Sequence, residues 1–322
     1  MKKFLLKLLT VVLVATSALF IGTACDKNSY SEGLAYALNY DGTSYIVYGR
    51  GSCTDTKIVI PETYEDKPVV EIGVDAFSSD STITEVVIPN TVKAINSNAF
   101  YNCVNLKSVT IPSSVEYIDK YVFYNCDSLT SIVIPNSVES IGENTLADCD
   151  KLKTLTIGNS VESVGLYAFY NCPIEVASVP TYALGRLDEK TLKTLTITCG
   201  DAISSYALAD FENLTSVTIL DSVKTIGSYA FSECKKLSTI KLPTTIESIG
   251  QYAFDNCDSL INITLPDSLQ TISSYAFSDC DSLINITLPD SLQTISSYAF
   301  SDCDSLTSID IPDKVTNLGS NV

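Results

Sequence analysis

The chain has 322 residues, of which 20 are basic, 38 are acidic and none is histidine, so its formal net charge is −18. This charge argues against a nucleic-acid partner, because phosphate binding needs clustered Lys and Arg side chains. The lack of histidine removes the commonest general base, the Ser-His and Cys-His nucleophile pairs and most zinc sites. An apolar fraction of 45% is enough for a large core and too high for a disordered chain.

Residues 1–24 have the layout of a secretory signal peptide. Three lysines among the first seven residues precede an apolar run of 14 residues, Leu8 to Ile21, which is shorter than a spanning helix needs. Two cleavage interpretations follow. In the first, the small residues before Cys25 resemble a bacterial lipobox, and Cys25 becomes the lipid attachment site of a cell-surface protein. In the second, cleavage after Ala24 releases a secreted protein. We favour the lipid anchor, which would be the protein's contact with a membrane.

Residues 25–54 are predicted to form an anchor linker and a capping β-hairpin. Strand-forming residues flank Asp41-Gly42 within Ala35–Tyr48, and Asp-Gly is a strong hairpin turn signal. We expect this hairpin to cover the first unit of the repeats that follow, because stacked repeats need a cap.

From residue 55 to residue 322 the sequence repeats with a period of about 23 residues. The unit reads L-x-x-V-x-I-P-x-S-V-x-x-I-G-x-x-A-F-x-x-C-x-x, and Cys257–Asp279 recurs without change as Cys280–Asp302. Eleven units are followed by an incomplete twelfth, whose open edge we expect to fray; pairing of this edge with another molecule is the alternative. The first unit has 28 residues, through an insert near Glu65–Val69, and the unit that starts at Ile174 has only 18. Such a period indicates a solenoid.

Each part of the unit has a physical reason. Two β-branched or apolar residues spaced two apart predict a short strand, which proline then ends. A second apolar pair, such as Val115 and Ile118, predicts a shorter extended segment. The next position holds Gly, Asn, Asp or Ser, as at Gly142, and we place a sharp turn of positive φ there. The A-F pair is then expected to start a short helical turn whose Phe enters the core.

The fold predicted from these parts is an α/β, β-rich solenoid of about eleven rungs. The recurring strand, proline, turn, A-F and Cys positions resemble the BspA-type (treponemal-type) leucine-rich repeat surface proteins over about residues 54–320. This resemblance implies a leucine-rich-repeat fold, a place on the bacterial surface, and adhesion or protein binding without catalysis. Ile174–Thr191 departs from the pattern, and we expect a local kink or a tightened rung there.

Eight cysteines occupy one position of the unit. Neighbours in a stack lie about 4.8 Å apart with parallel side chains, whereas a disulfide needs Cβ atoms about 3.8 Å apart and a turned geometry. We therefore predict a buried ladder of free thiols, although export ordinarily favours disulfides. The same parallel arrangement lacks the tetrahedral spacing of a metal site. The ladder consists of Cys103, Cys126, Cys149, Cys172, Cys234, Cys257, Cys280 and Cys303.

Two further columns are candidates for a partner surface. One is a tyrosine column two residues before the Phe, which either stacks between rungs to cover the core edge or forms an aromatic strip for a protein or a glycan. The other is a flat, nearly uncharged face of outward Thr and Ser on the predicted strands, for which β-propensity alone is a sufficient reason. The residues selected are Tyr206, Tyr229, Tyr252, Tyr275, Tyr298, Thr218, Thr264 and Thr287.

The remaining polar columns predict no chemistry. Aspartates such as Asp127 and Asp258 follow the Cys, and solvated turn residues are the default interpretation because no loop has the dense oxygen spacing of a calcium site. No Gly-rich phosphate loop is present in the sequence, and repeated carboxylates identify no acid–base pair. We therefore predict a protein that is not an enzyme and has no cofactor or metal. Its expected partner is an extracellular protein or, alternatively, a glycan bound by the Tyr column.

Overall fold

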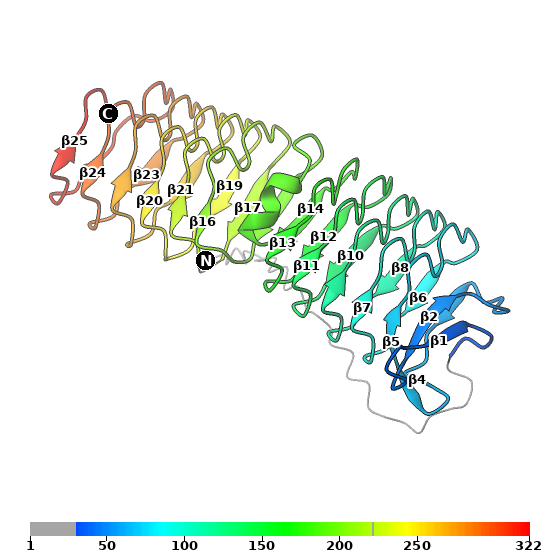
Figure 1. Ribbon diagram of the computed structural model, residues 1–322. Coiled ribbons are helices and arrows are strands. Elements are labelled where there is room, and N and C mark those ends of the chain that lie inside the picture. The colour runs from blue at the N-terminus through cyan, green and yellow to red at the C-terminus, as the bar shows by residue number, and fades with distance from the viewer. Residues whose placement is uncertain (1–29, 221) are drawn as a thin grey trace, which may run out of the picture.

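The computed structural model describes residues 30–220 and 222–322, which form one elongated stack of rungs (Figure 1). The predicted solenoid is confirmed, with about 12 turns of about 23 residues and few helices. The proposed signal peptide and Cys25 lie outside the described residues. Within the described part of the chain, no helix is long and apolar enough to span a membrane.

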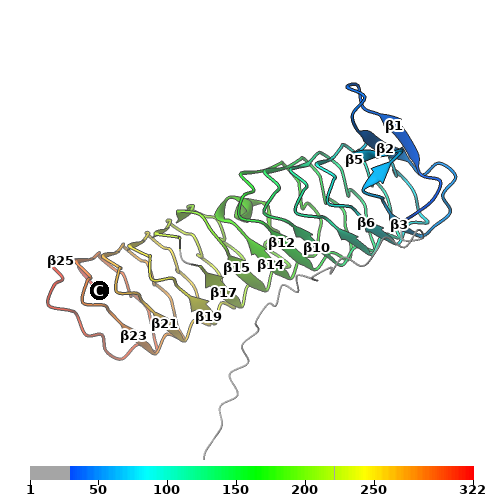
Figure 2. The same cartoon turned by 90° about the horizontal axis from the view of Figure 1, so that it is seen from below.

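A β-hairpin lies at the N-terminal end of the stack (Figure 2). Strands β1 (Ala35–Leu38) and β2 (Tyr45–Gly49) pair antiparallel around the Asp41-Gly42 turn. Strand β2 then pairs in parallel with β5 (Lys67–Ile72), so the hairpin continues one sheet of the solenoid beyond the first rung.

The insert in the first unit forms a second, shorter hairpin. Strand β4 (Thr63–Tyr64) pairs antiparallel with β5 through a turn at Glu65 and Asp66, which have φ values of 45° and 61°. The ring of Tyr64 stacks on that of Tyr36 with centroids 4.0 Å apart, which links the insert to the first hairpin.

The first strand of each unit contributes to one side of the solenoid, which we call the first face. Its strands pair in parallel and in register, as Ile132 with Leu155, so equivalent residues of successive units lie side by side. The strands are β3 (Lys57–Val59), β6 (Glu85–Val87), β8 (Ser108–Thr110), β10 (Ser131–Ile134), β12 (Thr154–Ile157), β14 (Val176–Val179), β15 (Thr194–Ile197), β17 (Ser216–Ile219), β19 (Thr239–Lys241), β21 (Asn262–Thr264) and β23 (Asn285–Thr287).

The second extended segments form the second face, in two separate sheets. One sheet continues from β5 through β7 (Ala94–Ile95), β9 (Tyr117–Ile118), β11 (Ser140–Ile141) and β13 (Ser163–Val164). The other contains β16 (Ala202–Ile203), β18 (Thr225–Ile226), β20 (Ser248–Ile249), β22 (Thr271–Ile272), β24 (Thr294–Ile295) and β25 (Asn317–Leu318).

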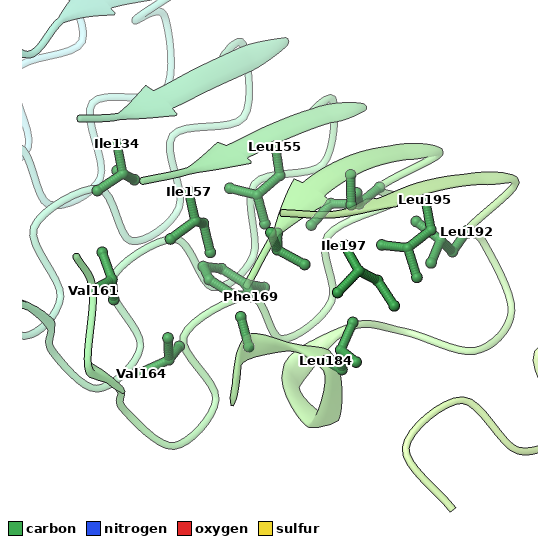
Figure 3. Packing of buried hydrophobic residues seen from close by; sticks show 14 of the residues in the cluster. Ile134, Leu155, Ile157, Val161, Val164, Phe169, Leu184, Leu192, Leu195 and Ile197 are labelled. Atoms are coloured by element: carbon green, nitrogen blue, oxygen red, sulfur yellow. The ribbon is translucent and has the colours of Figure 1, made fainter. Parts of the chain in front are cut away.

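The two sheets of the second face are separated by the irregular unit. Its second segment is the 3₁₀ helix η1 (Thr181–Arg186), which contacts β13 and buries Ala183 and Leu184. Figure 3 shows Leu184 and Phe169 pointing into the core beneath the strands of the first face. The first face runs unbroken through this rung, because β14 pairs with both β12 and β15. The departure predicted from the sequence is therefore confined to the second face and to the turn that follows it.

Where a helical turn was expected, each regular rung has a series of hydrogen-bonded turns, which we call the turn edge. In one rung the Ala99 N–H donates to the Asn96 carbonyl at 3.2 Å, and the Cys103 N–H donates to the Phe100 carbonyl at 3.3 Å. Within these two turns Asn98 and Asn102 have φ values of 58° and 56°, which a right-handed helix does not allow. The segment is therefore locally helical in its i→i+3 bonds but does not continue as a helix.

The predicted position of the positive φ was wrong by two residues. It falls at Asn144 (φ 53°), not at Gly142. Glycine serves another purpose at 142, because a Cβ there would lie 2.4 Å from the backbone nitrogen of Lys120 in the preceding rung. Each of seven rungs has two residues of positive φ, four positions apart, and the first of them is a tyrosine with φ between 56° and 61°, a conformation that bulky side chains rarely adopt. These are Tyr121, Tyr167, Tyr206, Tyr229, Tyr252, Tyr275 and Tyr298.

Hydrogen bonds along the solenoid axis accompany this conformation. The Asn98 N–H donates to the Lys120 carbonyl of the next rung at 3.2 Å, and the Phe100 N–H donates to the Val122 carbonyl at 2.9 Å. The same pattern recurs in successive regular rungs, so the turn edge carries an axial hydrogen-bond ladder. These bonds offset the unfavourable φ of the tyrosines and hold the turns in register.

Inside the stack, equivalent apolar side chains pack on each other. Seven core phenylalanines stack with their rung neighbours at centroid distances of 5.2–5.5 Å and interplanar angles of 3–9°. Each rung therefore buries its Phe only when the next rung is in place, as expected for a solenoid. The stacked residues are Phe77, Phe100 and Phe123 in the N-terminal half, and Phe231, Phe254, Phe277 and Phe300 in the C-terminal half.

Replacing one stacked ring should lower the stability of the whole array. Phe254 is fully buried between Phe231 and Phe277, so Phe254→Ala removes contacts on both sides and should lower the free energy of unfolding by about 3–5 kcal/mol. Urea denaturation followed by circular dichroism measures this. Tyr40→Ala is the control, because Tyr40 is fully exposed at the hairpin tip. A loss below about 1 kcal/mol for Phe254→Ala would contradict the packing described.

Candidate interaction surfaces

The first face combines small polar side chains with exposed aliphatic ones. Strand alternation places Ile263 in the core and its neighbours Asn262 and Thr264 outward. Of the predicted face residues, Thr264 and Thr287 are exposed and Thr218 is partly buried. Four aliphatic residues stand among these polar positions with 43–59% of their surface exposed, namely Val133, Val176, Ile261 and Ile284. Their exposure adds apolar area to a face that the sequence predicted as polar.

The charge on the first face differs from that of the chain as a whole. Between Lys107 and Thr287, the outward positions of this face contain four lysines and a single acidic residue, Glu175. Lys153 and Lys193 both pair with Glu175, the latter at 2.8 Å, and these contacts lower its pKa to about 2. A chain of net charge −18 thus has almost no acidic side chains on its first face between Lys107 and Thr287.

The five predicted tyrosines form one continuous stack on the turn edge. From Tyr206 to Tyr298, neighbouring rings lie 4.6–4.9 Å apart with interplanar angles of 5–16°. Each ring therefore covers the faces of its neighbours and turns an edge toward solvent. Tyr206 is 63% exposed and Tyr298 37% exposed, whereas the three rings between them are partly buried. This is the geometry of stacking between rungs, which was one of the two interpretations from sequence.

Further aromatic residues on the turn edge were missed by sequence reasoning. Tyr101 and Tyr124 stack at 5.0 Å in a column three residues after the tyrosine position of each rung. Tyr170 belongs to the same column and meets Tyr167 edge-on at 5.8 Å. With Leu166, these two tyrosines expose 54–61% of their surface beside the irregular rung. The 23-residue period contained the signal, because Tyr101, Tyr124 and Tyr170 occupy equivalent positions of the unit.

Seven of the eight column cysteines are buried, Cys303 is partly buried, and none of them forms a disulfide. Each thiol donates to the carbonyl of the Phe or Leu in the preceding rung at 2.9–3.3 Å, as Cys126 does to Phe100. All ten cysteines in the described part of the chain are free. Of the two outside the column, Cys53 is buried, and Cys199 is partly exposed with its Sγ 3.7 Å from the Tyr182 hydroxyl.

Burial makes three of the column thiols weaker acids than a thiol in water. It raises the pKa of Cys103 and of Cys234 to about 12, and it raises the pKa of Cys257 as well. Thiolates are the reactive form, so these side chains act as small core residues with a weak hydrogen-bond donor.

The aspartate columns form no metal site among the residues described. No group of three or more His, Cys, Asp or Glu side chains there is arranged to hold a metal ion. Burial, and after it the charge of Asp150, raises the pKa of Asp127, whose Oδ1 is buried without a hydrogen-bond partner. Burial, and after it the charge of Asp281, likewise raises the pKa of Asp258. Repulsion between like charges one rung apart accounts for part of both shifts.

Comparisons with known proteins find similarity to bacterial repeat proteins. A family model described as the BspA type leucine rich repeat region matches residues 52–193 and 201–322. A leucine-rich repeat protein from Bacteroides ovatus is 24% identical, with 91% of this chain and 95% of that chain covered and a TM-score of 0.41. A leucine rich cell surface protein from Faecalibacterium prausnitzii is 25% identical over 87% and 93%, with a TM-score of 0.40.

The leucine-rich repeat protein of T. pallidum is a third similar structure. It is 24% identical, with 71% of this chain and 88% of that chain covered and a TM-score of 0.41. No curated protein matches the chain significantly.

The raised thiol pKa values predict a loss of stability in alkali. In the unfolded chain a thiol ionises near pH 8.5, whereas Cys103 and Cys234 stay protonated to about pH 12 when folded. The stability that these two protonated thiols give to the folded protein is therefore complete below about pH 8.5, and it is lost as the pH rises toward 12. The melting temperature should fall over this range, and it should fall less steeply in the double variant Cys103→Ala/Cys234→Ala.

Cys199→Ala is the control for this measurement, because Cys199 is partly exposed. Tyrosines titrate over the same range in every variant, so the difference between the melting curves isolates the two thiols. If the melting temperature falls equally steeply with pH in the double variant and in the unaltered protein, the buried thiols do not cause the loss of stability in alkali.

Proposed function

Because the chain belongs to the BspA-type leucine-rich repeat family, we propose that it is a non-catalytic surface protein that binds an extracellular protein along its first face. Members of this repeat family are typically non-catalytic. In this proposal the signal peptide of residues 1–24 directs export, and a lipid on Cys25 holds the protein at the cell surface.

The composition of the first face carries the proposal. Binding a protein requires removing water from the surface, and charged groups resist this more than aliphatic or hydroxyl groups do. The first face offers exposed Ile261 and Ile284 among Thr, Ser and Asn, with almost no carboxylates. The identical repeats also place the same side chains at successive rungs, which favours an extended contact over a single pocket.

The glycan alternative has less support from the geometry of the Tyr column. Stacking of a sugar on an aromatic residue needs the face of the ring, and both faces of Tyr229, Tyr252 and Tyr275 are covered by neighbouring tyrosines. Only the ring edges and hydroxyl groups of Tyr229, Tyr252 and Tyr275 are turned outward. We therefore place the partner surface on the first face.

Introducing charge on the first face should weaken partner binding. A panel of immobilised extracellular-matrix proteins and a glycan array, screened with the purified protein, would identify the ligand. For a protein ligand, Ile261→Glu/Ile284→Glu should raise the Kd at least tenfold, because two carboxylates would be desolvated where two aliphatic side chains were buried. Biolayer interferometry measures the change.

Gln270→Glu/Gln293→Glu is the matched control, because it adds the same charge at exposed positions beside the second face. This variant should bind as the unaltered protein does. If both charge variants weaken binding equally, the first face is not the site. Binding of a glycan that Tyr229→Ala/Tyr252→Ala/Tyr275→Ala abolishes would favour the alternative function instead.

A further inference from the structure

The irregular rung leaves one place on the turn edge vacant. Its unit has 18 residues, five fewer than the regular unit, and the chain passes from η1 to β15 through residues 187–193 without an A-F turn. In Figure 1, η1 is the coiled ribbon near the middle of the stack. The turn of residues 165–172 and the turn of residues 204–211 are consequently neighbours across a missing turn. We call this place the vacant turn.

The axial hydrogen-bond ladder stops on both sides of the vacant turn. The N–H groups of Tyr167, Phe169 and Asn171 would donate to the next turn, and they have no acceptor among the described residues. On the far side, the carbonyls of Ser205 and Ala209 accept no hydrogen bond from any backbone N–H of the described residues. Tyr167 and Asn171 are exposed, so their N–H groups flank an accessible edge, whereas Phe169 is buried.

Two exposed tyrosines flank the vacant turn. Tyr167 and Tyr206 occupy the same position of the unit two rungs apart, which corresponds to about 9.6 Å at the usual strand spacing. Rings elsewhere in this column stack at 4.6–4.9 Å, so one further ring fits between these two. Tyr167 is 61% exposed and Tyr206 63%, against 37% for Tyr298, which like Tyr206 has one stacked neighbour. The vacant turn thus exposes ring faces that the rest of the column covers.

The opposite end of the vacant turn is acidic. A cavity of about 230 Å³ is lined by Asp150, Asn171, Cys172, Pro173, Asp188 and Thr191. Neither Asp150 nor Asp188 takes part in the ion pairs formed by the described residues. The Oγ1 atom of Thr191 is buried there without a hydrogen-bond partner. This end therefore complements a positively charged group that also donates hydrogen bonds.

We propose that the vacant turn is a second binding site, which takes a turn-forming segment of a protein partner carrying an aromatic side chain and, about four residues later, Lys or Arg. The aromatic ring enters between Tyr167 and Tyr206, and the backbone of the segment pairs with the unpartnered N–H and carbonyl groups. The cationic side chain reaches Asp150 and Asp188. The spacing of about four residues is that between Tyr167 and Asn171. This site is separate from the first face and does not depend on the function proposed above.

A peptide copied from the chain's own turn is a suitable probe. The turn Ser273–Ser278 reads Ser-Ser-Tyr-Ala-Phe-Ser, and one Lys added after it places the charge four residues beyond the Tyr. With a fluorescein label on this peptide, fluorescence anisotropy should show saturable binding to the full chain. Tyr206→Ala and, separately, Asp150→Asn/Asp188→Asn should each raise the Kd at least tenfold.

Matched variants separate this site from other surfaces. Tyr298→Ala removes a ring of the same column away from the vacant turn and should leave peptide binding unchanged, as should Ile261→Glu/Ile284→Glu on the first face. Circular dichroism before and after heating checks that each variant folds. The proposal is overturned if the unaltered protein does not bind the peptide saturably, if Tyr298→Ala weakens binding as much as Tyr206→Ala, or if an oligosaccharide displaces the peptide.

Discussion

A rung of this protein buries its apolar side chains only against the same side chains of the rungs on either side. Hydrogen bonds between successive rungs run along the first face, the second face and the turn edge, so all three share one spacing and one register. The columns of Phe, Cys and Tyr follow from that register. Each Cys thiol, for example, completes the hydrogen bonding of a Phe or Leu carbonyl in the preceding rung. Repetition of a residue is therefore a sign of its structural position and is weak support for a binding role.

Much of this fold could be predicted from the sequence. The residues of each unit indicate its strands and turns, and the 23-residue period indicates which residues of neighbouring units lie side by side. Strands, prolines, the hairpin around Asp41-Gly42 and the core Phe positions all follow from that pattern. The positive φ could not be placed by residue preference alone. Tyr229 adopts it because its N–H donates to Gln251 in the next rung, and this axial bond outweighs the ordinary preference for Gly or Asn. The stacking geometry of the Tyr column likewise depends on contacts between rungs that no single unit contains.

Departures from the repeat are better indicators of binding than the repeat itself. Ile261 and Ile284 occupy an outward position that holds Thr, Ser or a charged residue in other rungs, and both are about half exposed. The short unit at Ile174 removes a turn and leaves Tyr167 and Tyr206 with uncovered faces. The acidic side chains are also unevenly distributed, because they repeat along the turns and are almost absent from the first face between Lys107 and Thr287. A protein lengthened by copying units thus keeps two local surfaces that are chemically distinct from the rest.

Hydrogen exchange of the turn-edge amides tests most directly whether the axial ladder holds the rungs and stops at the irregular rung. The amides of Tyr121, Asn125 and Tyr229 donate to the following rung, whereas those of Tyr167 and Asn171 have no acceptor in the described chain. Site-resolved NMR exchange should therefore show slow exchange at the first three positions and exchange at least tenfold faster at Tyr167 and Asn171. Equal protection at all five amides would contradict the account, because a partner for the two free amides would then exist within the protein.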